Sequence, residues 1–254
     1  MSVYIVSDLH IWGPEDPLYL SLLDLICGRA QSGDTLVLAG DVFDLFVGNK
    51  AVFVDRYHKF FNALRQAGQR GVQVHYIEGN HDFLLKRTLG RMAGVALHSE
   101  EVSFEIQGKR FLVAHGDLAD QRDYSYRFLR AFFRSLPVRF LFWLAPGPWL
   151  ESFGKWSGKK SRKKNNLLVS QLPLERRENL RKIYRSYAAE RLAQGYDFMV
   201  MGHCHDLDEM SFKIGGRLGQ YVNVGFPRVH GSYLSWQPGE DQIHRETLPS
   251  RIFD

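Results

Sequence analysis

The residues of this chain best suited to metal chemistry lie in five short motifs. In chain order the motifs read D-x-H, G-D, G-N-H-D, H-G-D and G-H-x-H. They supply carboxylate, amide and imidazole donors and need no thiolate, a donor set that suits Mn²⁺, Fe²⁺ or Zn²⁺. The candidate ligands outnumber those that one tetrahedral ion takes, so we expect two ions that share a bridging ligand. The candidates are Asp8, His10, Asp41, Asn80, His115, His203 and His205.

Each motif follows directly on a short apolar run that is rich in aliphatic residues. Runs of this kind, without polar alternation, predict strands that are buried on both faces. The carboxyl ends of strands in an α/β sheet are where ligands gather. We therefore expect all the motifs to deliver their polar side chains to one edge. The predicted strands cover residues 3–6, 35–39, 74–77, 111–114 and 198–201.

Between the first strands, apolar residues recur at helical spacing over residues 18–29 and 52–67. Strands that alternate with helices favour an α/β layered domain. After residue 205, short apolar segments separated by Gly-Gly and Pro-Gly turns predict a meander of strands. These segments cover residues 210–214, 221–224, 232–235 and 242–246.

The stretch from about residue 120 to residue 191 interrupts the alternation. It contains no predicted strand, is dense in aromatic residues, and carries six basic residues within ten positions. We interpret it as a helical lid inserted into a single domain that spans residues 1–254. The aromatics are either the insertion's own core or an apolar surface beside a cationic loop, which would suit an acylated phosphate. The basic residues are Lys155, Lys159, Lys160, Arg162, Lys163 and Lys164.

Composition narrows the class of protein without naming a substrate. With 254 residues, 44% hydrophobic and 24% charged, the chain is long enough for a substantial core and is neither disordered nor collagen-like. Two cysteines exclude a disulfide scaffold, and a net charge of +5 favours anionic partners. No targeting signal precedes the first strand, and the most apolar stretch, residues 140–145, is far too short to span a bilayer. We expect a cytoplasmic protein that at most lies on a membrane.

The order of the five motifs resembles that of the calcineurin-like metallophosphoesterase family. The resemblance implies a four-layer αββα sandwich in which two divalent ions hydrolyse a phosphorus ester, with a hydroxide between the ions as the nucleophile. It implies that one ion is held by Asp8, His10 and His205 and the other by Asn80, His115 and His203, with Asp41 as the bridge.

His81 and Asp82 complete the G-N-H-D motif. His81 is not needed as a ligand and stands beside Asn80 at the mouth of the predicted site. We therefore expect it to donate a proton to the leaving group or to a phosphoryl oxygen, with Asp82 orienting its ring. The alternative role for His81 is a structural hydrogen bond at the turn.

Over its whole length the chain is similar to the branch of this family that hydrolyses the pyrophosphate of UDP-2,3-diacylglucosamine in lipid A synthesis. The two share the overall length, the D-L-H opening, F-L-L after G-N-x-D, and an aromatic helical lid. The resemblance implies release of UMP and 2,3-diacylglucosamine 1-phosphate from this lipid-linked nucleotide sugar, with Mn²⁺ as the expected metal. It also implies acyl chains under the lid and peripheral contact with the cytoplasmic face of the inner membrane. The implied substrate contacts are Asn80, Asp123, Ser161, Asn165 and His203.

Two positions depart from that branch. Its well-studied members carry arginine where this chain has His81, as general phosphodiesterases do, and Leu168 stands near the place of a substrate-binding lysine. The alternative function is therefore a general metallophosphodiesterase or phosphatase that acts on nucleotides or on another anionic lipid. A non-catalytic binding module would have lost ligands that this chain retains. Clustered aromatics are less typical of nucleic-acid binding than single stacking platforms are, so we expect no nucleic-acid partner. The oligomeric state is left open.

Overall fold

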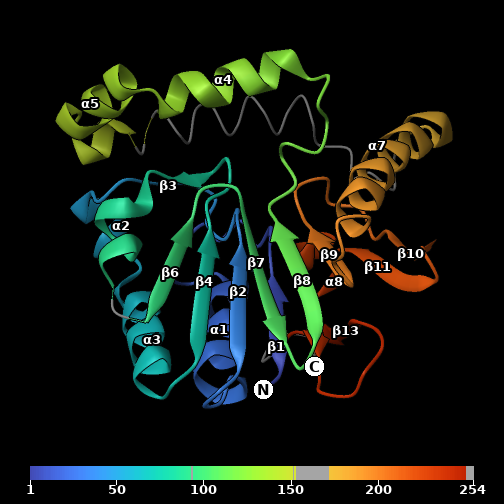
Figure 1. The fold of residues 1–254 in the computed structure, drawn as a ribbon. Helices are drawn as coiled ribbons and strands as arrows, with labels where there is room; N and C mark the ends of the chain where they lie inside the picture. The colour runs from blue at the N-terminus through green and yellow to red at the C-terminus, as the bar shows by residue number, and fades with distance from the viewer. Residues whose placement is uncertain (93, 151, 153–171, 250–254) are drawn as a thin grey trace.

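Two β-sheets face each other in the computed structural model, which describes residues 1–92, 94–150, 152 and 172–249 (Figure 1). In the six-stranded sheet the four strands from the N-terminal half are parallel to one another. Two C-terminal strands extend this sheet, each pairing antiparallel with its inner neighbour. Its order is β13 (His244–Thr247), β12 (Ser232–Trp236), β1 (Val3–Val6), β2 (Thr35–Ala39), β4 (Gln73–Ile77) and β6 (Val95–His98).

The second sheet has five strands, of which the three central ones are parallel and the two outer ones antiparallel. A small parallel pair, β3 (Phe46–Val47) and β5 (Asp82–Phe83), lies near the carboxyl ends of the first sheet. The order of the five-stranded sheet is β10 (Glu209–Ile214), β11 (Arg217–Asn223), β9 (Phe198–Met201), β8 (Lys109–Ala114) and β7 (Glu101–Ile106).

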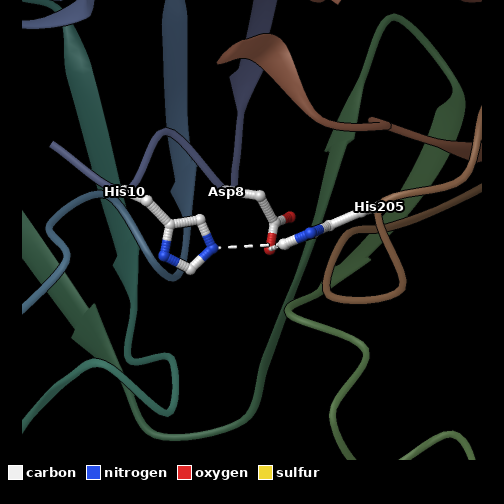
Figure 2. A group of neighbouring side chains, drawn as sticks. All are labelled: Asp8, His10 and His205. Atoms are coloured by element: carbon white, nitrogen blue, oxygen red, sulfur yellow. Dashed lines mark hydrogen bonds and ion pairs between the residues drawn. The ribbon is translucent and has the colours of Figure 1, made fainter. Parts of the chain in front are cut away.

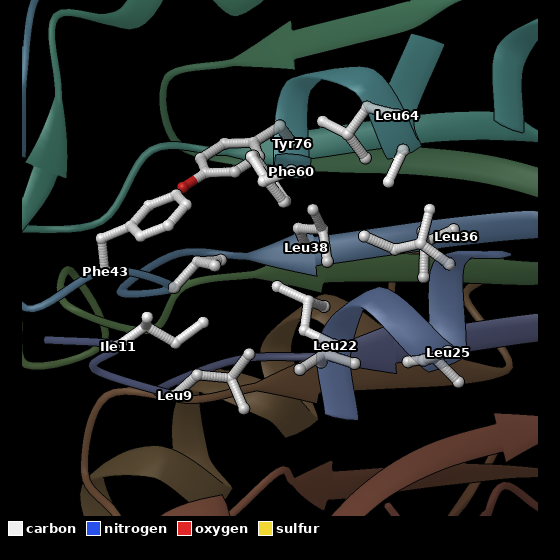
Figure 3. Packing of buried hydrophobic residues seen from close by; sticks show 14 of the residues in the cluster. Leu9, Ile11, Leu22, Leu25, Leu36, Leu38, Phe43, Phe60, Leu64 and Tyr76 are labelled. Atoms are coloured by element: carbon white, nitrogen blue, oxygen red, sulfur yellow. The ribbon is translucent and has the colours of Figure 1, made fainter. Parts of the chain in front are cut away.

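Helices cover the outer face of the six-stranded sheet. α1 (Pro17–Asp24) begins where the Asp16 carboxylate accepts a hydrogen bond from the Leu18 amide, with proline at its first position, and it continues as the π-helix η1 (Leu25–Arg29). Together with α3 (His58–Gln69), α1 buries leucines and aromatics against β2 (Figure 3). Full burial of such a side chain contributes about 1.5–3 kcal/mol, so this layer is a major source of stability.

A second apolar layer fills the space between the sheets, and a third lies between the five-stranded sheet and α7 (Leu174–Leu192). The layers therefore follow the order helix, sheet, sheet, helix. This confirms the predicted αββα sandwich. All five strands predicted to precede the motifs are present, and each of the four segments after residue 205 forms a strand.

Some elements differ from the sequence prediction. The strands β6 and β7 were not predicted, because they lie at sheet edges and are only partly buried, so their apolar pattern is weak. The predicted helix over 52–67 is divided into α2 (Ala51–Val54) and α3 by a turn.

The helices α4 (Tyr124–Arg134) and α5 (Leu136–Leu144) lie above the carboxyl ends of the strands rather than on a sheet (Figure 1). No residue of α4 is fully buried. Phe133 and Phe142 pack on each other and on Phe83, but other aromatics of the insertion are at least half exposed. These are Tyr124, Phe128, Phe132, Phe140, Trp143 and Trp149.

An internal core of the insertion therefore explains only some of its aromatics. The basic residues from Lys155 to Lys164 lie outside the described residues. α7, at the end of the predicted insertion, differs from α4 and α5 because it packs on the five-stranded sheet. In the described part of the chain, no helix is long and apolar enough to cross a membrane.

Candidate metal centre and active site

The five motifs meet at one end of the two facing sheets. Asp8, Asp41 and Asn80 follow β1, β2 and β4 of the six-stranded sheet, while His115 follows β8 of the five-stranded sheet. The G-H-x-H motif follows β9, beside β8. The expectation that the motifs share one edge is therefore confirmed, and the edge is formed by both sheets.

The first cluster consists of Asp8, His10 and His205 (Figure 2). The His10 Nε2 and His205 Nε2 atoms lie 3.2 Å apart, and His205 Nε2 lies 3.3 Å from Asp8 Oδ1. Asp8 Oδ2 accepts hydrogen bonds from Ser7 Oγ at 2.6 Å and from the His203 amide at 2.9 Å. Asp8 Oδ1 is buried without a hydrogen-bond partner. A buried carboxylate oxygen without a partner, facing two imidazole nitrogens, fits a bound cation.

The second cluster is built around His115, which is fully buried. Its Nε2 lies 3.1 Å from Asn80 Oδ1 and 3.2 Å from His203 Nδ1. Its Nδ1 lies 3.0 Å from the Ala39 carbonyl oxygen. Donation of the Nδ1 proton to that carbonyl leaves the Nε2 lone pair directed into the cluster, as is usual for metal-binding histidines.

Asp41 lies between the two clusters. Its Oδ2 is 3.8 Å from His10 Nε2 and 3.5 Å from His115 Nε2, so one oxygen faces both groups. The other oxygen, Oδ1, accepts a hydrogen bond from the His81 amide at 2.9 Å. A carboxylate in this position can neutralise the repulsion between two neighbouring divalent ions.

Most of the protonation states suit metal binding, which needs neutral imidazoles and ionised carboxylates. Burial lowers the pKa of His10 to about 3 and that of His203 to about 4. Although burial acts in the opposite direction, His115 and His81 hold the pKa of Asp41 well below its usual range. His115 is the exception, because Asp41 outweighs burial and raises the pKa of His115 to about 10. A cation at Nε2 would therefore replace a proton.

The backbone of the centre is unusual. Seven described residues other than glycine have φ in the left-handed region, and five of the seven are predicted ligands. This conformation costs of order 1 kcal/mol per residue and concentrates at functional sites. Neighbouring glycines are required as well, because a Cβ at Gly202 would meet Asp8 Oδ2 and one at Gly79 would meet Asp41 Oδ1. The five predicted ligands are Asp8, His10, Asp41, His203 and His205.

Cys204 lies between two histidines with left-handed backbone, His203 and His205, so the segment 203–205 is not extended. The Cys204 side chain lies away from the clusters. Its Sγ accepts a hydrogen bond from Asn223 Nδ2 at 3.1 Å and packs in the layer under α7.

His81 lies at the edge of the first cluster. Its ring meets the His10 ring edge to face, with centroids 4.8 Å apart, and its Nδ1 lies 2.8 Å from the Asp44 carbonyl oxygen. Among the described residues, Asp82 makes no hydrogen bond with this ring. Its Oδ1 accepts from the Asp41 and Gly79 amides and its Oδ2 from Val42, Phe43 and the Tyr76 hydroxyl. The expectation that Asp82 orients His81 is therefore wrong, because backbone donors already use both carboxylate oxygens.

Two further residues support the first cluster and were not predicted. The Phe226 ring stacks on His205 with centroids 4.4 Å apart and planes at 4°. Arg228, in α8 (Pro227–His230), donates from Nη2 to the Leu9 and His10 carbonyls at 3.1 and 2.9 Å. Neither residue belongs to a motif, so the sequence carried no signal for them.

The predicted substrate contacts have different positions. Asn80 and His203 lie in the centre, whereas Asp123 caps α4 by accepting a hydrogen bond from the Tyr126 amide at 2.8 Å. Ser161 and Asn165 lie outside the described residues. Nearby, the Asp117 carboxylate accepts hydrogen bonds from Tyr126 Oη at 2.7 Å and from Arg130 Nε at 2.8 Å, which joins α4 to the loop after β8.

A four-layer sandwich with a histidine and carboxylate centre at its strand ends defines a metal-dependent phosphoesterase. Comparison with known proteins agrees: the family model for calcineurin-like phosphoesterases matches residues 1–207, and the chain belongs to this family. It is therefore a metal-dependent hydrolase.

Several relatives of the chain are named UDP-2,3-diacylglucosamine hydrolase. The protein of Aeromonas salmonicida (strain A449) is 26% identical over 251 residues, covering 98% of this chain and 95% of its own length. That of Edwardsiella ictaluri (strain 93-146) is 26% identical over 265 residues, covering 98% of both chains. That of Escherichia coli O6:H1 is 31% identical over 131 residues, covering 52% of this chain and 54% of its own.

Proposed function

We propose that the protein hydrolyses the pyrophosphate of UDP-2,3-diacylglucosamine to UMP and 2,3-diacylglucosamine 1-phosphate, a step of lipid A synthesis. The observation that carries the proposal is the exposed aromatic surface of α4 and α5 above a metal centre. A soluble nucleotide would need no such surface, whereas an acylated substrate does. The relatives that match over nearly the whole chain support the same substrate.

The centre would hold two divalent ions, with Mn²⁺ expected and Fe²⁺ or Zn²⁺ as alternatives. When bound, the ions supply Lewis acidity toward the phosphoryl oxygens and activate water for attack. The carboxylate of Asp41 would hold the two sites together, and the Nδ1 bond of His115 to Ala39 keeps its other nitrogen available. We assign Asp8, His10 and His205 to one ion, Asn80, His115 and His203 to the other, and Asp41 to both.

His81 would act as the proton donor, and Asp82 would act only by shaping the loops around it. The His81 Nδ1 is held at the Asp44 carbonyl, which leaves Nε2 to face a substrate. Burial disfavours its charged form, but Asp41 and Asp44 raise the pKa of His81 above its ordinary value. The ring is therefore suited to donate a proton to a phosphoryl oxygen or to the leaving group.

The remaining substrate would lie toward the helical insertion, which we propose spans about residues 120–191 of a single domain. Acyl chains would contact the apolar side chains of α4 and α5. Asn80 and His203 in the centre, and Asp123, Ser161 and Asn165 in the insertion, are the proposed contacts to the sugar and phosphates.

We further propose peripheral contact of the lid with the cytoplasmic face of the inner membrane. A cavity of about 530 Å³ beneath α5 is lined by Phe140 and Trp143 and by five basic side chains. Within the described part of the chain these five have no ion-pair partner. Exposed aromatics beside unpaired cations suit an anionic bilayer surface. The basic residues are Lys50, Lys86, Arg87, Arg91 and Arg139.

Product analysis tests the proposed reaction. Purified protein with Mn²⁺ is expected to release UMP from UDP-2,3-diacylglucosamine in detergent micelles and to act poorly on bis-p-nitrophenyl phosphate or UDP-glucose. Efficient hydrolysis of the soluble esters without UMP release from the lipid would instead support a general phosphodiesterase or phosphatase. Sedimentation with phosphatidylglycerol vesicles, but not with phosphatidylcholine vesicles, tests the membrane contact separately.

A further inference from the structure

α7 is tied to the loop that follows the G-H-x-H motif. Arg181 Nε and Nη2 donate to the two oxygens of Asp206 at 2.5 and 3.1 Å. One turn later, Arg185 Nε and Nη2 donate to Asp208 at 3.0 and 2.6 Å. Both are two-point pairs of a planar guanidinium with a carboxylate, which fix orientation as well as distance. Asp206 and Asp208 are only 2% and 4% exposed.

These carboxylates stand next to the metal centre in sequence. Asp206 directly follows His205, which has a φ of 56°. This left-handed conformation is unfavourable for a residue with a Cβ atom, so neighbouring contacts must hold it. The same helix reaches the loop after β8, where Tyr184 Oη donates to the Gly116 carbonyl at 3.1 Å, one residue after His115. One helix therefore contacts both loops through which the five-stranded sheet contributes to the centre.

We infer that Arg181 and Arg185 are positioning residues for His203 and His205. They act through Asp206 and Asp208, which keep the G-H-x-H loop in its left-handed conformation. Loss of these pairs would therefore weaken metal binding although no ligand is changed. The inference rests on the proposed metal centre. Groups that orient ligands in this way typically change metal affinity by about 10–100-fold.

The test compares metal binding by full-length variants. Arg181→Lys and Arg185→Lys keep the charge and lose the two-point geometry, so they avoid leaving a buried carboxylate without a counter-charge. After chelation and dialysis, calorimetric titration with Mn²⁺ is expected to show a dissociation constant raised about tenfold or more for at least one of two equivalents. Co²⁺ titration, followed by visible absorption, should show altered bands.

Matched controls lie on the exposed side of the same helix. Lys182→Arg and Arg176→Lys change side chains that are exposed and have no ion-pair partner in the described part of the chain, and should bind Mn²⁺ as the wild type does. If the Arg181 and Arg185 variants bind two equivalents with wild-type affinity and spectra while their melting temperatures fall, the pairs serve stability alone and the inference is overturned. A wild-type protein that binds no Mn²⁺ would instead overturn the proposed function, and this inference with it.

Discussion

At the scale of single residues, His81 and Asp82 are neighbours with different surroundings. The His81 ring faces the metal centre and is held by a single carbonyl, whereas the Asp82 carboxylate is enclosed by backbone donors. A substitution of His81 should therefore affect catalysis, and a substitution of Asp82 should affect the stability of the fold.

The variant His81→Ala is expected to keep both metal ions and to lose turnover by about 10²–10⁴-fold, the usual contribution of a positioned acid or base. The ring contributes no ligand to either proposed ion, so the centre should persist. Metal analysis of the purified variant and its turnover number check the two halves of the prediction. Loss of metal together with activity would reassign His81 to a structural or ligand role.

The variant Asp82→Asn is expected to lower the free energy of unfolding by about 1–3 kcal/mol, because the new amide group would turn a donor toward backbone N–H groups. Urea unfolding at neutral pH measures the change. Asp241→Asn is the matched control, since the Asp241 side chain is 90% exposed in its ion pair with Lys109 and should change stability very little. Equal effects of the two substitutions would contradict this role for Asp82.

Residue types and their spacing were sufficient to predict that the candidate ligands converge at one place, because each candidate follows a strand that could be recognised independently. The contacts of His81, Asp82 and Arg228 were not predictable in this way. They depend on which loops approach one another once two sheets have packed, and no local pattern encodes that approach.

At the scale of elements, the edge of the six-stranded sheet carries a pair of histidines. His75 in β4 and His98 in β6 lie 3.1 Å apart between Nδ1 and Nε2, and the His75 ring stacks on Phe104 of β7. Burial lowers the pKa of His75 to about 4 from 6.5, and also lowers the pKa of His98. The His75 ring is therefore neutral in the folded protein under mildly acidic conditions.

Between pH 6.5 and pH 4 the unfolded chain binds protons at His75 that the folded chain does not. The free energy of unfolding therefore loses nothing to His75 above pH 6.5, and it decreases as the pH falls from 6.5 toward 4. After allowance for solvent screening, His75 should account for about 1–2 kcal/mol of this loss. His75→Phe retains the stacking on Phe104 and should reduce the loss. Urea unfolding at several pH values measures this loss for the wild type and for His75→Phe. His58→Phe, which replaces an exposed histidine of α3, is the control and should show the same loss as the wild type.

The predictability of elements follows their burial. The strands β1, β2 and β9 are buried throughout, so a continuous apolar run identified them. For α4, α5 and α7 the sequence indicated helices, but not that α7 joins the sandwich while the other two stand away from it. That difference depends on which helix face finds a sheet to cover, which is a property of the assembled fold.

At the scale of the whole molecule, two sheets are joined by an apolar layer along their length and by the polar centre at one end. Asp8, His10, Asp41 and Asn80 come from the six-stranded sheet and His115, His203 and His205 from the five-stranded one. Each proposed ion has ligands from both sheets. Without the ions, this end holds converging polar atoms, including Asp8 Oδ1, which is buried without a hydrogen-bond partner. Metal binding should therefore stabilise the fold as a whole.

Removal of the metals is therefore expected to lower the melting temperature by about 5–10 °C. An ion present at a hundredfold excess over its dissociation constant contributes about 2.7 kcal/mol, and each kcal/mol corresponds to roughly 2–4 °C in a chain of this size. Differential scanning calorimetry with and without EDTA measures the shift, and added Mn²⁺ should restore the higher value. Asp41→Asn, which weakens the link between the clusters, should show a smaller shift. An unchanged melting temperature, with metal analysis confirming that EDTA removed bound ions, would show that the apolar layer alone holds the sheets together.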